Sequence, residues 1–217
     1  MIIVNLKTYK ESTGLAAVKL AKSAEKVSRE YGVRIVLAPQ ATDLRLVKDK
    51  GHIEVFAQHI DEAAQGKFTG WTTVEAVKDA GATGVLINHS EHRIPFEKIR
   101  YAVERCRAIG LQSVVCADSV EEGEKLKALK PDFIAVEPPE LIGGDISVSK
   151  AKPEIISDAV ARVQTKETSV LVGAGIKDGN DVSVALELKS KGILVASGVV
   201  LAKDPESVLR DFAKAWR

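Results

Sequence analysis

Short runs of β-branched and aliphatic residues recur along the chain, and most are separated by longer stretches with helical periodicity. The runs span four or five residues and are largely apolar on both faces, which is typical of strands in a parallel sheet covered by helices. We predict strands at Ile2–Leu6, Val33–Leu37, Glu54–Ala57, Thr83–Ile87, Gln112–Cys116, Phe133–Val136, Ser169–Val172 and Gly192–Ala196.

The stretches between the runs predict amphipathic helices. In the first of them, apolar residues at i, i+3 and i+4 spacing share one face, which we expect to be buried. The residues of this face are Leu15, Val18, Ala21, Ala24, Val27 and Tyr31.

Helix boundaries are marked by residues with known terminal preferences. Pro95 suits the first turn of a helix that Gly110 ends, and Asp204-Pro205 opens the last helix in the same way. A further helix begins at Glu121 and ends in basic residues before Pro131, which matches the helix dipole at both ends.

Eight strand–helix units in 217 residues indicate a closed α/β architecture. We predict a single compact (β/α)8 TIM barrel that occupies residues 1–217 as one domain, since such barrels take about 250 residues and at least about 200. An open sheet is the alternative. A dinucleotide-binding sheet is disfavoured, because no glycine-rich turn follows the first strand and Gly179 comes one residue too late after Gly173 and Gly175.

Composition narrows the choice of partners. Lys+Arg (31) and Asp+Glu (30) nearly cancel, so we expect no nucleic-acid partner and no anionic membrane partner. No stretch approaches the roughly 18 apolar residues of a membrane span, and no leader sequence is evident. Cys106 and Cys116 form neither a CxxC pair nor a zinc pattern, so we expect a reducing, cytoplasmic location.

Polar residues follow several of the predicted strands, where the chemistry of a barrel is found. Glu137 follows an apolar strand and precedes two prolines, so its pKa is expected to rise toward that of a general base. His89 follows Gly-Val-Leu-Ile, where we expect a helix N-terminus to lower its pKa. The strand ends also carry Asn5 and Lys7, and glycine-containing turns that offer N–H groups to a phosphate: Gly173-Ala174-Gly175 and Ala196-Ser197-Gly198.

Each of these features has a structural alternative. Glu137 and Lys7 could be solvated surface charges, His89 could be a satisfied structural histidine, and the glycine turns could be tight connections only. Cys116 is interpreted as a packing residue, since no base is evident beside it.

Four motifs together resemble the triosephosphate isomerases in their short archaeal form, over essentially the whole chain. The N-x-K pattern alone is common by chance, but N-H-S-E after the fourth predicted strand and E-P-P-E-L-I-G after the sixth are together highly specific. The motifs are Asn5-Leu6-Lys7, Asn88-His89-Ser90-Glu91, Val136-Glu137-Pro138 and Ala196-Ser197-Gly198.

This resemblance implies the interconversion of dihydroxyacetone phosphate and D-glyceraldehyde 3-phosphate in glycolysis and gluconeogenesis, without metal or cofactor. Glu137 would be the base, His89 the neutral electrophile, Lys7 a fixed positive charge and Asn5 a positioning residue. Besides Asn5 and Lys7, the resemblance assigns the substrate phosphate to Ile142, Gly143, Gly175, Ala196 and Ser197.

The resemblance also implies a homo-oligomer, dimer or tetramer. Gln58 and Phe68-Thr69-Gly70 are similar to a family loop that docks into a neighbouring subunit, and an exposed Phe and Trp on one loop often mark an interface. Alternatively, Trp71 caps its own helix.

Two rivals stay open. Another phosphate-binding barrel would share the last two turns but would not need Asn5, Lys7, His89 and Glu137 together. A non-catalytic barrel could bind a sugar phosphate as a sensor or scaffold.

Residues 138–143 resemble the family's lid. The end of the lid reads Gly143-Gly144-Asp145, where the archaeal members usually have Gly-Thr-Gly, and Ser147 occupies a position where proline is common. A carboxylate near a phosphate lid is expected to alter lid kinetics or weaken ligand binding.

Asp145→Gly should therefore change KM or kcat in a steady-state isomerase assay. Unchanged values of both would rule out this role of Asp145.

Overall fold

The computed structural model describes residues 1–138, 153–173 and 175–216. Within them, eight parallel strands pair in sequence order and β8 pairs with β1, so the barrel is closed and the open-sheet alternative is wrong. Every strand boundary lies within two residues of its predicted position. The strands are β1 (Ile2–Asn5), β2 (Ile35–Ala38), β3 (Glu54–Ala57), β4 (Gly84–Ile87), β5 (Gln112–Ala117), β6 (Phe133–Val136), β7 (Ser169–Val172) and β8 (Ile193–Val195).

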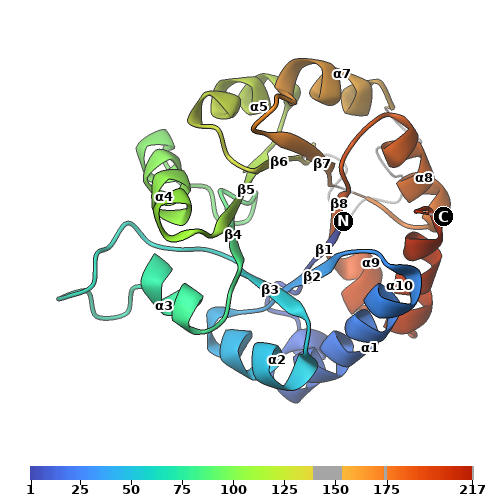
Figure 1. Cartoon of the computed structure of the whole chain (residues 1–217), viewed down its shortest axis with the longest axis horizontal. Helices are drawn as coiled ribbons and strands as arrows, with labels where there is room; N and C mark the ends of the chain where they lie inside the picture. The colour runs from blue at the N-terminus through green and yellow to red at the C-terminus, as the bar shows by residue number, and fades with distance from the viewer. Residues whose placement is uncertain (139–152, 174, 217) are drawn as a thin grey trace.

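Helices surround this barrel as an outer ring (Figure 1). The α-helices of the described residues are α1 (Leu15–Tyr31), α2 (Leu44–Gly51), α3 (Val74–Asp79), α4 (Phe96–Ile109), α5 (Val120–Leu126), α7 (Pro153–Val163), α8 (Gly179–Glu187), α9 (Ser197–Val200) and α10 (Pro205–Lys214). Short 3-10 turns add η1 (Lys10–Ser12), η2 (Ala41–Asp43) and η3 (Lys127–Leu129).

The predicted helix ends are largely confirmed. Pro95 immediately precedes α4 and its carbonyl accepts the N–H groups of Lys98 and Ile99, while Gly110 ends the helix in the left-handed conformation at φ 74°. Asp204 caps α10 by accepting the N–H of Ser207. The predicted helix from Glu121 is shorter than expected, because α5 tightens into the 3-10 turn η3 after Leu126.

The buried face of α1 is confirmed in its middle but not at its two ends, since Tyr31 is only partly buried. Val18, Ala21, Ala24 and Val27 are buried, but Leu15 is 74% exposed, so its predicted burial is wrong. Leu15 is the first residue of the helix, and helical side chains lean toward the N-terminus, which carries it past the packed layer.

Both faces of the sheet are buried, as the strand pattern predicts. Residues that point outward pack under the helices, and a second cluster fills the barrel interior, with Phe56 at 0% exposure among its members. The space for this ring comes from Gly84 on the neighbouring strand, since a Cβ there would lie 2.7 Å from two Phe56 ring carbons. A filled interior leaves the barrel mouths as the places for a site.

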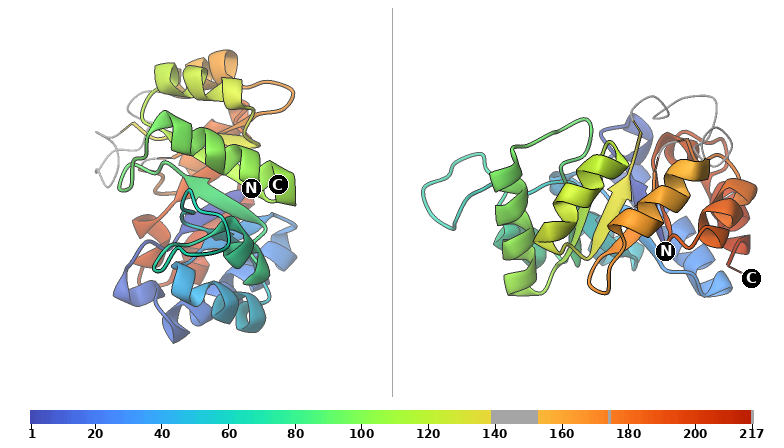
Figure 2. Two further views of the ribbon diagram at one scale, coloured as in Figure 1. Left: turned by 90° about the vertical axis from the view of Figure 1, so that its left-hand side faces the viewer. Right: turned by 90° about the horizontal axis from the view of Figure 1, so that it is seen from above.

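Because all strands are parallel, their carboxyl ends meet at one mouth, which brings residues following β1, β4, β6, β7 and β8 together. The long connection between β3 and α3 extends away from the barrel and its helices (Figure 1 and Figure 2). In the described ranges, no helix is both long enough and apolar enough to cross a bilayer.

Candidate active site

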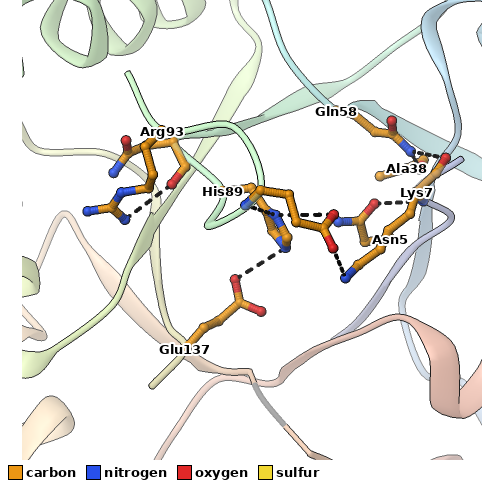
Figure 3. Close-up of polar contacts among 9 residues, drawn as sticks. Asn5, Lys7, Ala38, Gln58, His89, Arg93 and Glu137 are labelled. Carbon is orange, nitrogen blue, oxygen red and sulfur yellow. Dashed lines mark hydrogen bonds and ion pairs between the residues drawn. The ribbon is translucent and has the colours of Figure 1, made fainter. Parts of the chain in front are cut away.

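The site begins at the end of β1, where the chain turns sharply. Lys7 adopts a left-handed conformation with φ 47°, and its N–H donates to Oδ1 of Asn5, which is buried, at 3.0 Å. The side-chain amide of Gln58 donates to the carbonyls of both Lys7 and Ala38, at 3.0 and 2.8 Å. Asn5 and Gln58 together hold the turn that directs the Lys7 amine into the mouth (Figure 3).

Glu91 is the ion-pair partner of that amine. Its Oε1 lies 2.6 Å from Nζ of Lys7, whose side chain is only 14% exposed, while the Glu91 side chain is 58% exposed. The pair joins the end of β1 to the segment after β4. It fixes the position of the Lys7 charge, although an ion pair with so exposed a partner adds little to stability.

Asn88 braces the segment that carries His89. Asn88 directly follows β4 with φ 63°, donates from Nδ2 to the Cys116 carbonyl at 3.1 Å, and accepts the N–H of Ile94 on Oδ1 at 3.1 Å. Arg93 forms an ion pair with Glu122 across the same segment. These contacts fix the position of the backbone from which the His89 side chain extends.

The protonation of His89 follows from its contacts. Its Nδ1 lies 3.2 Å from the N–H of Glu91 and accepts a hydrogen bond from it, so the neutral ring carries its proton on Nε2. Burial lowers the pKa of His89, and the positive charges of Lys7 and Arg93 lower it further, whereas Glu91 opposes them. The imidazole is therefore neutral near pH 7.

The predicted reason for the lowered His89 pKa is wrong. A turn closed by the His92 N–H and the His89 carbonyl follows β4, and α4 begins only at Phe96, so His89 does not lie at a helix N-terminus. Burial and neighbouring cations act in place of the expected helix dipole.

Glu137 lies just beyond β6 and faces His89 across the mouth (Figure 3), with 3.8 Å between its Oε2 and the histidine Nε2. Burial raises the pKa of Glu137 to about 7, while the Cys116 thiol, which hydrogen bonds to the carboxylate, and the Lys7 charge both oppose that rise. Within the described residues, Oε2 has no hydrogen-bond partner. The solvated-surface alternative for Glu137 does not hold, because the residue is buried.

Gly173 makes room for this carboxylate. A Cβ at Gly173 would lie 2.3 Å from Cγ and 2.7 Å from Oε1 of Glu137. The N–H of Gly173 also donates to the Val136 carbonyl at 3.1 Å, which ties the end of β7 to the residue before Glu137. The glycine after β7 therefore serves the carboxylate directly.

The other wall of the mouth comes from the segments after β7 and β8. Gly175 has φ 68°, and Ser197 begins the short helix α9 directly after Ala196. A cavity of about 520 Å³ joins these segments to Asn5, Lys7, His89 and Glu137. Its lining thus includes every predicted site residue that the structure describes, whereas Ile142 and Gly143, with the lid residues Gly144, Asp145 and Ser147, lie outside the described residues.

Comparisons with known proteins decide the family. The triosephosphate isomerase family matches residues 1–215. Triosephosphate isomerase of Methanothermus fervidus is 50% identical over 213 residues, covering 97% of this chain and 96% of the relative. That of Methanocaldococcus jannaschii is 47% identical, with 99% of each covered, and that of Sulfolobus acidocaldarius is 45% identical, with 99% and 94% covered.

The chain belongs to the triosephosphate isomerase family. It is therefore an isomerase of the intramolecular oxidoreductase class, and the family resemblance seen in its four motifs is confirmed. Among the residues that the structure describes, no group of three His, Cys, Asp or Glu side chains is arranged to hold a metal ion.

Sequence reasoning missed several contacts of this triosephosphate isomerase family site. The sequence identifies Glu91 only as part of a motif and Gln58 only as part of an interface loop. It indicates only a packing role for Cys116. Each contact joins segments that are far apart in the chain, at separations of 84 residues for Lys7 and Glu91 and 51 for Lys7 and Gln58. Their signal in the sequence is a polar residue at or just beyond a strand end.

The raised pKa of Glu137 predicts a stability change with pH. The pKa of Glu137 is about 7 in the folded state and 4.5 in an ordinary, solvated glutamate. The contribution of this group to the free energy of unfolding is therefore fully present below pH 4.5 and is lost as the pH rises to about 7. Glu137→Gln removes this loss. Its gain in free energy of unfolding should be larger at pH 8 than at pH 5 by about 2–3 kcal/mol in urea titrations.

Glu104→Gln, at an exposed position on α4, is the matched control and should show no such dependence. Equal gains for Glu137→Gln at the two pH values would contradict the buried, high-pKa carboxylate.

Proposed function

We propose that this chain interconverts dihydroxyacetone phosphate and D-glyceraldehyde 3-phosphate through an enediolate, in glycolysis and gluconeogenesis. The observation that carries the proposal is the facing pair of Glu137 and His89, a carboxylate with pKa about 7 opposite a neutral imidazole, at the edge of the cavity. A base and an electrophile on either side of a substrate are what proton transfer beside a carbonyl requires.

Glu137 is the proposed base. Its ionised carboxylate removes a proton from the hydroxyl-bearing carbon beside the carbonyl, and the electron pair of that C–H bond forms the double bond of the enediolate. The same carboxyl returns the proton to the neighbouring carbon. A pKa of about 7 suits both steps, since proton transfer is most efficient when the pKa of the group lies near the working pH.

His89 is the proposed electrophile. Its Nε2–H is directed toward the cavity edge where Glu137 lies, because Nδ1 is occupied by the Glu91 N–H. Hydrogen bonding from Nε2–H to the substrate oxygens stabilises the enediolate. Nε2 then gives its proton to one oxygen and takes a proton back from the other, so the imidazole ends neutral. The net reaction exchanges hydrogens between two carbons and two oxygens, so it needs no external electron carrier.

Lys7 and Asn5 are proposed to bind substrate at the same mouth. The Lys7 ammonium adds positive charge near the enediolate and the phosphate, and Glu91 limits where that charge can lie. Asn5 positions the substrate and supports the Lys7 turn. The phosphate is assigned to backbone groups of Gly175, Ala196 and Ser197, which line the far side of the cavity, with Ile142 and Gly143 added by family resemblance.

Kinetics of Glu137 variants test this function against a non-catalytic sugar-phosphate binder. Glu137→Gln should lower kcat about 10²–10⁴-fold with a modest change in KM, since a positioned base contributes about that much. Glu137→Asp keeps the carboxylate but withdraws it by one methylene, so kcat should fall about 10²-fold. A coupled isomerase assay at pH 8 provides the measurement.

The control Glu104→Gln should keep native kcat in the same assay. A native protein that binds a triose phosphate and yet shows no turnover would favour the binder, and retention of native kcat by Glu137→Gln would remove Glu137 as the base.

We propose that the chain forms a homo-oligomer through the connection between β3 and α3, which extends from the body of the molecule (Figure 1 and Figure 2). On it, Phe68 and Trp71 are 41% and 47% exposed, and their rings lie 5.5 Å apart. Asp61 holds the base of this loop by exchanging backbone and side-chain hydrogen bonds with Thr72. Apolar rings presented on an ordered loop fit a protein interface.

The alternative that Trp71 caps its own helix is wrong, because Thr73 caps α3 by accepting the N–H of Ala76. The two rings are therefore available for a contact outside the loop. A second copy of this chain is the proposed partner, with dimer and tetramer both compatible.

Trp71→Lys should shift the protein toward a smaller species, since a charge would replace an apolar ring in a desolvated contact. Sedimentation velocity at micromolar concentration measures the change. Leu201→Lys, at another exposed apolar position, is the matched control and should leave the assembly unchanged. A Trp71→Lys protein with native sedimentation would place the interface elsewhere.

We further infer a cytoplasmic location and a single domain over residues 1–217. Both cysteines are free and buried, which suits a reducing compartment. The family match over residues 1–215 and the closed barrel support one domain.

A further inference from the structure

Asp181 is a fully buried charged residue that the proposed mechanism does not use. Its relative exposure is 0%, and it lies in the first turn of α8, four residues after Lys177, the last residue of the segment 175–177 that lines the cavity. Burying a carboxylate is costly unless hydrogen bonds compensate for lost water. The contacts of Asp181 therefore show what its burial achieves.

One oxygen of Asp181 holds the backbone of the cavity segment. Oδ2 accepts the N–H of Lys177 at 2.9 Å, and the N–H of Asp181 itself donates to Oδ1 of Asp178 at 2.9 Å. The second bond is an ordinary N-cap of α8. The first reaches beyond the cap into the segment after β7, so it fixes that segment relative to the helix.

The segment that Asp181 holds is in close contact with the segment after β8. Gly175, Ile176 and Lys177 line one side of the cavity, and Ser197 and Gly198 line it beside them. A Cβ at Gly198 would lie 3.1 Å from the Ile176 carbonyl oxygen, so the two backbones nearly touch. A small shift of residues 175–177 would therefore change the position of this segment relative to residues 197–198.

The helix that carries Asp181 is itself fixed in place. The N–H of Gly179 donates to Oδ2 of Asp211 on α10 at 2.7 Å, and a Cβ at Gly179 would lie 2.6 Å from the Asp211 carbonyl oxygen. The start of α8 is thus in backbone contact with α10. Asp181 transmits this fixed position to the cavity segment.

We propose that Asp181 is a positioning residue for the phosphate end of the site. Through the Lys177 N–H it sets residues 175–177 against α9, so that backbone N–H groups from Gly175 and Ser197 point at the same anion. The inference rests on the proposed function, which assigns the phosphate to this end. It differs from a capping role, which would affect the stability of α8 but not the affinity for phosphate.

Binding of inorganic phosphate separates these roles. Asp181→Ala should raise the Kd for inorganic phosphate about 10-fold by isothermal titration, as expected for misplacing a hydrogen bond to a charged group. KM should rise by a similar factor while kcat changes less than about 2-fold, since phosphate contacts hold substrate and transition state alike. Asp181→Asn keeps an acceptor for the Lys177 N–H and should restore near-native values.

Asp204→Ala is the matched control, because it removes an N-cap aspartate from α10. It should lower Tm without changing either the phosphate Kd or KM. If Asp181→Ala also lowers only Tm, then Asp181 is a capping residue and the inference is overturned. Native Kd and KM in Asp181→Ala combined with a changed kcat would overturn it as well.

Two further outcomes are decisive. If Asp181→Ala does not fold, Asp181→Ser is used in its place, since the shorter hydroxyl does not reach the Lys177 N–H. The inference then requires that Asp181→Ser bind inorganic phosphate more weakly than Asp181→Asn does. A native protein that fails to bind inorganic phosphate would overturn both the proposed function and this inference. Native binding with equal affinity in both variants would overturn this inference alone.

Discussion

The loss of water around the Glu137 carboxylate is the constraint on which the site depends. Burial at the end of β6 raises the pKa of this group to about 7, even though the Cys116 thiol and the Lys7 charge favour its ionised form. An ordinary glutamate would be a weaker base by more than two pKa units. Gly173 provides the space that keeps the carboxylate inside the mouth, so the conformation of β7 and the basicity of Glu137 are linked.

Two charged residues of the site, Lys7 and Glu91, shift the pKa values of Glu137 and His89 in opposite directions. Lys7 lowers the pKa of both Glu137 and His89, and Glu91 raises both. Because Lys7 and Glu91 form an ion pair at 2.6 Å, their effects on the two groups partly cancel, and burial decides both pKa values. Burial favours the uncharged forms of both histidine and glutamic acid, so it lowers the pKa of His89 and raises that of Glu137. An uncharged imidazole can therefore face a carboxyl group whose pKa lies near 7.

The sequence predicts the barrel well because every strand carries its own signal. Apolar runs at Glu54–Ala57 and Phe133–Val136 give strands with those very bounds, since strands buried on both faces leave little freedom in composition. Glu137 and His89 could be found because each follows such a run. The position of Leu15 could not, because helical periodicity describes a face and says nothing about where the packed layer ends.

The contacts that tune the site were less predictable, since they depend on how the closed barrel brings loops together. Lys7 at φ 47° and Asn88 at φ 63° adopt conformations that residue type alone does not require. Each is held by a contact with another segment: the Gln58 side chain donates to the Lys7 carbonyl, and the Cys116 backbone carbonyl accepts from the Asn88 side chain. The motif residues thus identify the chemistry, while neighbouring strands determine whether those residues adopt the geometry it needs.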